Sequence, residues 1–270
     1  MLRITPQSGI LGGTFLFITS ISICTILVPL RMLELGFSLT QIGVVTATSA
    51  MISLLGQLPE TDAQKPPQRF TVVLKNALFL LSASRTLQLA IFCAFIAAIP
   101  FALNGSFYPV YYVSLGYDER MVGTFSALLN IAVFITGMAF GYLNKRFHFR
   151  IIITISLLGT GLSMVFLAWS TTMFQLIPVI MLQGLVLGLA TVMSVFLASE
   201  AAGAGERGIT IGVMEMGFSG ALFLIPLSFG FALERIEYGT AFLILGAFLI
   251  SLGVLFKTAI RRSYIKAELR

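Results

Sequence analysis

Eight long apolar runs restrict the folds that this chain can adopt. Each is about 20 residues long, which is the length that an α-helix needs to cross the hydrocarbon core of a bilayer. Charged residues make up only 10% of the chain, whereas a soluble domain carries about 25%. The sequence therefore predicts an all-α, polytopic membrane protein with about eight transmembrane helices. The runs lie at residues 9–31, 39–58, 86–113, 120–142, 150–169, 175–198, 209–232 and 239–257.

The connections between the runs divide the chain into four parts. Residues 1–58 hold two spans, and the first is too long for the core of a signal peptide, so we expect it to be retained. Residues 59–85 form a loop that begins with the proline-rich PETDAQKPPQR and continues as an amphipathic stretch, which predicts an interfacial helix at 70–83. Six spans follow in residues 86–258, and residues 259–270 form a basic tail.

Basic residues gather on one side of this predicted topology. With both termini in the cytoplasm, the opposite side holds only Arg31, Arg120 and Arg235. Such an asymmetry is typical of inserted proteins, so we predict a multi-pass protein of the cell (inner, cytoplasmic) membrane. The net charge of +6 is then loop charge and indicates no nucleic-acid partner. The cytoplasmic set is Arg3, Lys65, Arg69, Lys75, Arg85, Lys145, Arg146, Arg150, Arg207, Lys257, Arg261, Arg262, Lys266 and Arg270.

A short hairpin sequence occurs twice. PLRMLELGFSLTQIG at 29–43 and PVYYVSLGYDERMVG at 109–123 share a proline and two glycines at a constant offset of 80 residues. Two such hairpins predict a transporter built from duplicated halves. With six spans per half, equivalent hairpins would lie roughly 180–200 residues apart, at about 30 residues per span and loop. The first half therefore lacks roughly 100–120 residues, or about four spans.

The loop after the fourth run carries a further motif. Residues 141–150 read GYLNKRFHFR, and the chain resembles the major facilitator superfamily, whose motif at this place is roughly G-x-L-a-D-r-x-G-r-r. The matches are Gly141, Leu143, Arg146 and Arg150, while Lys145 replaces the acid and His148 the later glycine. The entrance of the seventh run, ERGITIG at 206–212, is also similar to the family's R-G-x-x-x-G.

The resemblance implies a secondary transporter that works by alternating access between two halves, with no cofactor and no enzymatic activity. The expected partners are the lipid bilayer, a small-molecule solute, protons and, because a wall is missing, a second copy of the chain in a homo-oligomer. Proton-coupled efflux (antiport) of small apolar or drug-like compounds suits the apolar spans. The alternatives are a truncated, transport-inactive membrane protein and an uptake permease for sugars or other metabolites.

Glu215 is the acidic residue that stands out. Of the eleven acids, it alone lies well inside an apolar run. A charged group at membrane depth costs about 3 kcal/mol on insertion scales and usually faces the bundle interior or a water path. We therefore predict that Glu215 couples transport to protons, with Gly212 and Ser219 on the same helix face. The alternative is a structural acid that is hydrogen-bonded to a neighbouring helix or reaches the near interface.

Polar side chains inside other runs are candidates for the solute path. Asn104, Tyr108 and Tyr111 follow i, i+4, i+7 spacing on the third run, which places them on one face of a continuous helix. Tyrosines near a membrane end also form interfacial belts, and this alternative is favoured for Tyr111. The other candidates, each of which could instead make an interhelical hydrogen bond, are Ser126, Asn130 and Gln183.

The basic loop after the fourth run and the glycines within the runs each allow a structural interpretation. Gly141, Leu143, Lys145, Arg146 and Arg150 form a candidate cytoplasmic gate, or merely topology-setting charge. Close helix packing explains the glycines: Gly184, Gly188, Gly208, Gly212, Gly239, Gly246 and Gly253.

One His and two Cys, both Cys inside apolar runs, predict no metal site, no disulfide and no catalytic triad.

Overall fold

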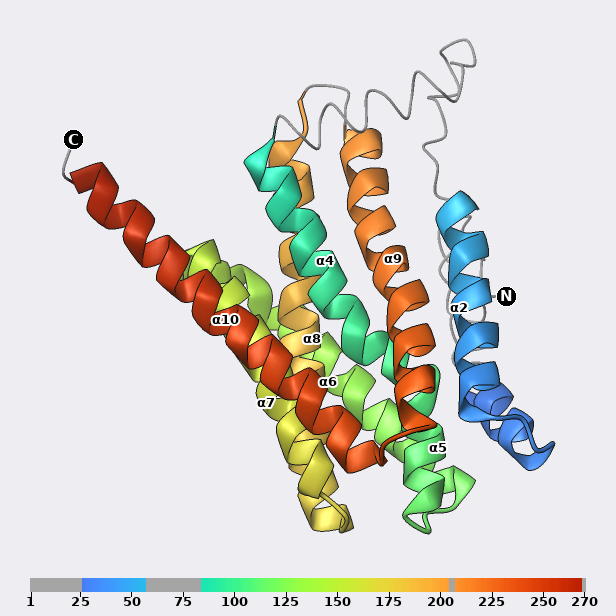
Figure 1. Ribbon diagram of the computed structural model, residues 1–270. Helices are drawn as coiled ribbons and strands as arrows, with labels where there is room; N and C mark the ends of the chain where they lie inside the picture. The colour runs from blue at the N-terminus through green and yellow to red at the C-terminus, as the bar shows by residue number, and fades with distance from the viewer. Residues whose placement is uncertain (1–25, 57–83, 204–206, 269–270) are drawn as a thin grey trace, which may run out of the picture.

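The computed structural model describes residues 26–56, 84–203 and 207–268 of the chain, and within these ranges every regular element is a helix. A helical segment at 26–34 precedes the hairpin that leads into α2. The remaining helices (Figure 1) are α2 (Leu39–Gly56), α4 (Arg85–Asn104), α5 (Phe107–Ser114), α6 (Glu119–Arg146), α7 (Phe149–Trp169), α8 (Met173–Ala201), α9 (Arg207–Leu233) and α10 (Tyr238–Glu268).

Six of these helices are long and apolar enough to cross a membrane: α4, α6, α7, α8, α9 and α10. They coincide with the third to eighth predicted spans, and α2 coincides with the second. The first predicted span, 9–31, is described only from residue 26, and the predicted loop and interfacial helix at 59–83 lie outside the described residues. The polytopic all-α fold is therefore confirmed, with slightly fewer spans observed than the eight predicted.

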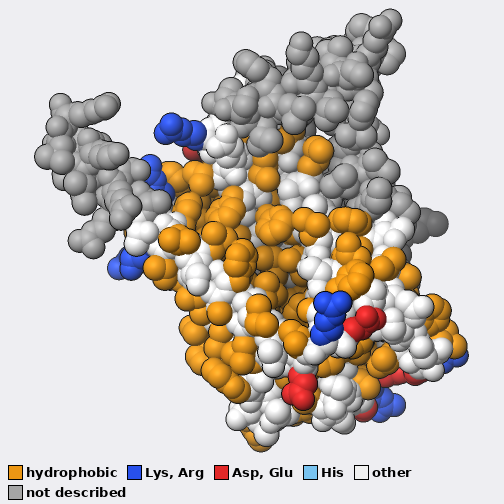
Figure 2. Space-filling view, viewed as in Figure 1, with side chains coloured by type: hydrophobic (Ala, Val, Ile, Leu, Met, Phe, Trp, Pro, Cys, Tyr) orange, Lys and Arg blue, Asp and Glu red, His pale blue; other side chains and the backbone are white. Residues whose placement is uncertain are grey.

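The six long helices form one bundle with α4 and α8 at its centre. α9 packs along α4, α6 and α7 pack along α8, and α10 packs along α7. Figure 1 shows α10 leaning away from α9, while α2 lies on the opposite side of α9. In Figure 2 hydrophobic side chains cover much of the visible face, and the few charged ones lie in its lower half and along its left edge.

The duplicated hairpins have the same backbone conformation. Gly36 and Gly116 both adopt positive φ, +79° and +91°, which a residue with a Cβ rarely does. The amide after each glycine donates to a carbonyl five residues back: Phe37 to Met32 (3.0 Å) and Tyr117 to Tyr112 (3.1 Å). This 6→1 bond and a left-handed glycine define a Schellman helix end. The repeat found in the sequence is therefore also a repeat in structure.

The helices that follow begin in the same register. The amide of Gln41 donates to the hydroxyl of Ser38 (3.2 Å), and the amide of Met121 donates to the carboxylate of Asp118 (2.9 Å). Each side chain caps one of the unpaired amides at a helix N-terminus. α2 and α6 thus begin 80 residues apart, at Leu39 and Glu119, and are structural counterparts.

The third predicted span is two helices rather than one, and a continuous helix over 86–113 is wrong. α4 ends at Asn104 and α5 begins at Phe107. Pro109 explains the position of the break, because a proline ring clashes with the carbonyl four residues earlier in a helix, which is that of Gly105. The hydroxyl of Ser106 satisfies the carbonyl of Ala102 (2.6 Å) at this break.

Most of the glycines predicted to pack do so. A Cβ on Gly184 would overlap with the carbonyl oxygen of Leu129 in α6, and one on Gly188 would lie 2.9 Å from that of Val133. Gly246 and Gly253 lie equally close to α7. At Gly208 the prediction is wrong for the described part of the chain, since none of its atoms lies within 4 Å of the position that a Cβ would occupy there. This glycine is the second residue of α9.

Candidate functional site

The break between α4 and α5 sends the polar side chains of the third span to different partners. Asn104 lies at the end of α4, and its carboxamide oxygen accepts a hydrogen bond from Ser126 of α6 (3.2 Å). Asn104 is partly exposed and Ser126 is buried. Two predicted site residues are therefore paired across helices, but Asn104 does not share a continuous helix face with Tyr108.

Tyr108 lies on α5 and pairs with Gln183 of α8. The carboxamide nitrogen of Gln183 donates to the Tyr108 hydroxyl (2.5 Å), and this hydroxyl donates to the sulfur of Met164 in α7 (3.4 Å). All three side chains are fully buried. The carboxamide oxygen of Gln183 has no partner among the described residues. This cluster holds α5, α7 and α8 together inside the bundle.

Removing the Tyr108 hydroxyl tests this cluster. Tyr108→Phe leaves the carboxamide nitrogen of Gln183 with only the sulfur of Met164 (3.8 Å), and its oxygen has no partner among the described residues, so we expect the free energy of unfolding in detergent to fall by about 1–2 kcal/mol. Adding Gln183→Leu removes the unpaired groups and should restore part of that loss. A cycle of the two single variants and the double variant measures the coupling. Strict additivity of the two losses would contradict the pairing.

Tyr111 ties α5 to the end of α7. Its hydroxyl lies 3.2 Å from the carbonyl oxygens of Leu167 and Ser170, to which it donates. Leu167 lies in the last turn of α7 and Ser170 is its C-cap, so this tyrosine adds to the cap bond that the Ser170 amide donates to the Leu167 carbonyl (3.2 Å). It also packs edge-on against Phe242, 5.2 Å between ring centroids, in an aromatic cluster that includes Tyr112 and Tyr238. The sequence did not reveal this cluster, because its rings come from separate helices.

Glu215 is half-buried on α9, and within the described residues it makes no hydrogen bond or ion pair. Of the described acids, it alone lies in the interior of a long helix. One turn further along, Phe218 contacts Phe101 of α4, with 5.6 Å between ring centroids. Ser219 is fully buried, whereas Gly212 is partly exposed. The carboxylate thus lies beside the edge that α4 and α9 share.

Asn130 follows Ser126 by one helical turn on α6 but lies in different surroundings. It is exposed, and none of the described residues is its hydrogen-bond partner. The two residues therefore do not line a common buried path in this conformation.

The basic motif spans the turn between α6 and α7. Lys145 and Arg146 are in the last turn of α6, where positive charge is favourable. The guanidinium of Arg146 donates to the Tyr142 hydroxyl (2.9 Å), and no described carboxylate lies within ion-pair distance of either cation. The guanidinium of Arg150 lies over the Phe149 ring, 5.6 Å from its centroid. Gly141 is exposed and Leu143 partly so.

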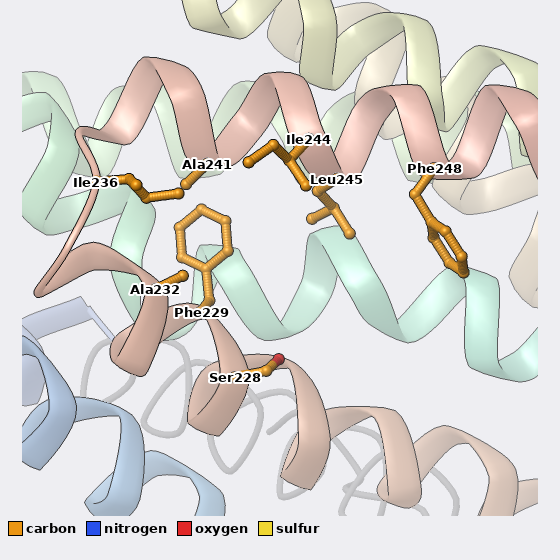
Figure 3. A pocket seen from close by; sticks show the side chains of 8 residues that line it. All are labelled: Ser228, Phe229, Ala232, Ile236, Ala241, Ile244, Leu245 and Phe248. Atoms are coloured by element: carbon orange, nitrogen blue, oxygen red, sulfur yellow. The ribbon is translucent and has the colours of Figure 1, made fainter.

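A cavity of about 300 Å³ lies between α9 and α10 (Figure 3). Apolar side chains surround it, and the hydroxyl of Ser228 is already bonded to the carbonyl of Leu224 (2.7 Å). None of the predicted site residues lines this cavity. It is a consequence of the tilt of α10 and is suited only to apolar groups. The lining residues are Ser228, Phe229, Ala232, Ile236, Ala241, Ile244, Leu245 and Phe248.

No group of three or more His, Cys, Asp or Glu side chains that could hold a metal ion occurs in the described ranges. Cys93 is buried and packs as an apolar side chain in α4.

The chain is similar to known proteins in sequence and in fold. A family model described as "Major Facilitator Superfamily" matches residues 90–269. No curated protein matches the chain. One similar solved structure is a POT family transporter in complex with a thioalcohol-conjugated peptide, 14% identical, with a TM-score of 0.51 over 96% of this chain and 55% of that one. Another is a POT family transporter in complex with 5-aminolevulinic acid, 14% identical, with a TM-score of 0.49 over 94% and 55%. The chain spans about half the length of these transporters.

Proposed function

Because this chain belongs to the major facilitator superfamily, a family of membrane transporters, we propose that it moves small solutes across a bilayer by alternating access. In this proposal residues 86–258 form a six-helix half and residues 1–58 are what remains of the other half. The chain is a multi-pass membrane protein and not an enzyme. We further propose the cell (inner) membrane as its location, with both termini cytoplasmic.

The observation that carries this proposal is Glu215. A carboxylate in the interior of a membrane helix is costly and is retained where it has a task or a partner. Glu215 is half-buried and has no partner among the described residues, so a structural ion pair there does not explain it. A group that takes up and releases a proton as the transporter changes conformation does explain it.

The edge between α4 and α9 supplies surroundings for a solute. Phe101 is 44% exposed and its ring lies against Phe218, one turn from Glu215. The Asn104–Ser126 pair lies one turn beyond Phe101 on α4. An aromatic pair between a carboxylate and a carboxamide suits small, largely apolar molecules with one polar or cationic group. Proton-coupled efflux of such drug-like compounds is our specific proposal.

The length of the chain supports a second candidate, a transport-inactive membrane protein. The chain spans 55% of one solved transporter that it resembles, and in our proposal only the two helices of residues 1–58 face the six of residues 86–258, so most of one wall of an alternating-access path has to come from outside these residues. A second copy of the chain in a homo-oligomer would supply a wall, and we propose this arrangement for the active form.

Flux in liposomes tests the proposal. The purified chain is reconstituted, a pH gradient is imposed in either direction, and the movement of a panel of dyes, cations and sugars is measured. We expect apolar cationic dyes to move against the proton flow. Sugars moving with the proton flow would instead indicate an uptake permease. No flux above protein-free liposomes, from chain that is folded and inserted, would favour the inactive protein.

A further inference from the structure

We infer that the exposed face of α6 binds α6 of a second copy of this chain. The contact surface is a row of six residues, called the α6 stripe here: Gly123, Ala127, Asn130, Phe134, Gly137 and Gly141.

The duplicated hairpins support a helix partner on this face, because α2, the counterpart of α6, packs against α9. In the first hairpin, α2 lies so close to α9 that a Cβ on Gly43 would overlap with the carbonyl oxygen of Pro226. The counterpart of Gly43, 80 residues later, is Gly123, and no atom of residues 26–56, 84–203 or 207–268 lies within 4 Å of the position that its Cβ would occupy. α6 therefore presents the same docking glycine as α2, but uncovered.

The spacing of the α6 stripe is that of a helix–helix seam. Its members alternate steps of four and three residues, the heptad period of a left-handed helix pair. Four of the six are Gly or Ala, which allow membrane helices to approach closely. Phe134 is 67% exposed, and Gly137 beside it leaves room for a neighbouring helix. All six are exposed or partly exposed.

Asn130 supplies an independent reason for a partner. It is the twelfth of the 28 residues in α6, roughly 16 Å along the helix at 1.5 Å per residue, and so lies near the middle of a span. Asn130 is exposed and has no hydrogen-bond partner among the described residues, and a carboxamide in that state would be unfavourable if this face of the span met hydrocarbon. A second Asn130 across a two-fold axis satisfies it, since each carboxamide both donates and accepts.

A second copy fits this face better than a helix of the same chain. α2 and α6 are structural counterparts, and α2 packs against α9. Among the described helices, α9 is the one that could receive α6 in the same way, but α2 already covers it. Two copies inserted with the same topology hold their α6 helices parallel, so identical residues meet at the axis, as in parallel coiled coils. The α6 stripe is complementary to itself in this arrangement, with Asn130 against Asn130 and Gly137 leaving room beside Phe134.

Disulfide cross-linking in membranes tests the inference. In a chain carrying Cys24→Ser and Cys93→Ala, single cysteines replace Ala127, Asn130, Phe134 or Gly137. The controls are cysteines at Ile131 and Met138, which lie on α6 beside the stripe and are 54% and 74% exposed. With a copper–phenanthroline oxidant, we expect at least about tenfold more covalent dimer from stripe positions than from the controls.

The yield of covalent dimer must depend on position in the α6 stripe and not on exposure alone. Met138 lies outside the stripe but is more exposed than Phe134, so exposure alone would give more dimer from Met138. Gly137→Leu should lower the cross-linking of the Asn130→Cys chain severalfold, whereas Gly220→Leu, at an equally open glycine on α9, should leave it unchanged. Equal dimer yields at all six positions, or a chain that remains monomeric throughout, would overturn the inference. So would cross-linking of the stripe only to another polypeptide. Cross-linking requires no solute, so a silent transport assay does not affect this test.

Discussion

We expect Glu215→Gln to abolish proton-driven solute flux in liposomes and to leave solute exchange without a pH gradient intact. Glutamine keeps the size and polarity of the side chain but cannot take up or release a proton at this site. The loss should be at least tenfold, which corresponds to about 1.4 kcal/mol of coupling free energy. Exchange without a gradient requires only binding and alternating access, so it separates lost coupling from lost folding.

The matched control is Glu234→Gln. Glu234 is an exposed acid in the turn between α9 and α10, so the same chemical change there should leave both driven flux and exchange at wild-type values. Equal driven flux from the Glu215→Gln chain and the wild type would remove Glu215 from coupling and make it a packing residue. Loss of exchange together with driven flux, from a chain shown to be folded and inserted, would assign Glu215 to solute binding.

Much of the fold follows from the sequence because a bilayer narrows the choice. Apolar runs of about 20 residues predict spanning helices, and α2, α6, α7, α8, α9 and α10 lie where the runs do. The hairpin glycines were also informative, since positive φ at Gly36 and Gly116 requires a residue without a side chain. The break after Asn104 was missed, although Pro109 marks it, because an apolar run alone does not distinguish one helix from two.

Less of the candidate site follows from the sequence. Spacing relates residues on one helix, so it can select Tyr108 and Gln183 as polar residues within spans but cannot pair them across α5 and α8. The same limit applies to Asn104 and Ser126, whose partnership depends on where α4 ends. Glu215 needed no partner to be noticed, because a charge within an apolar run is visible in the sequence alone. Its coupling role and the gate role of Lys145, Arg146 and Arg150 stay predictions.

The attachment of α2 to α9 should be sensitive to any added side-chain volume. α2 and α9 meet at two glycines: Gly43 against the carbonyl of Pro226, and Gly230 with its Cβ position 2.8 Å from the carbonyl oxygen of Leu39. Thr40 adds a hydrogen bond to the Gly230 carbonyl (3.4 Å). Because these neighbours are backbone atoms, they cannot move aside as a flexible side chain would. Any side chain at Gly43 must therefore push the two helices apart.

We expect Gly43→Ala to lower the free energy of unfolding in detergent by about 3 kcal/mol, the upper end of the usual cost of overpacking. In the monomeric, detergent-solubilised chain, its counterpart Gly123→Ala should have the opposite sign or no effect, because a methyl group there meets no atom of the described residues and alanine favours a helix by up to about 1 kcal/mol over glycine. Unfolding by SDS measures both variants under the same conditions. Equal losses would mean that α2 and α6 are both covered in the monomer, and equal stability would mean that α2 does not rest on α9 at Gly43. A loss at Gly43 alone would establish that the two halves of the repeat have the same shape and different neighbours, the asymmetry that leaves the α6 stripe free for a second copy.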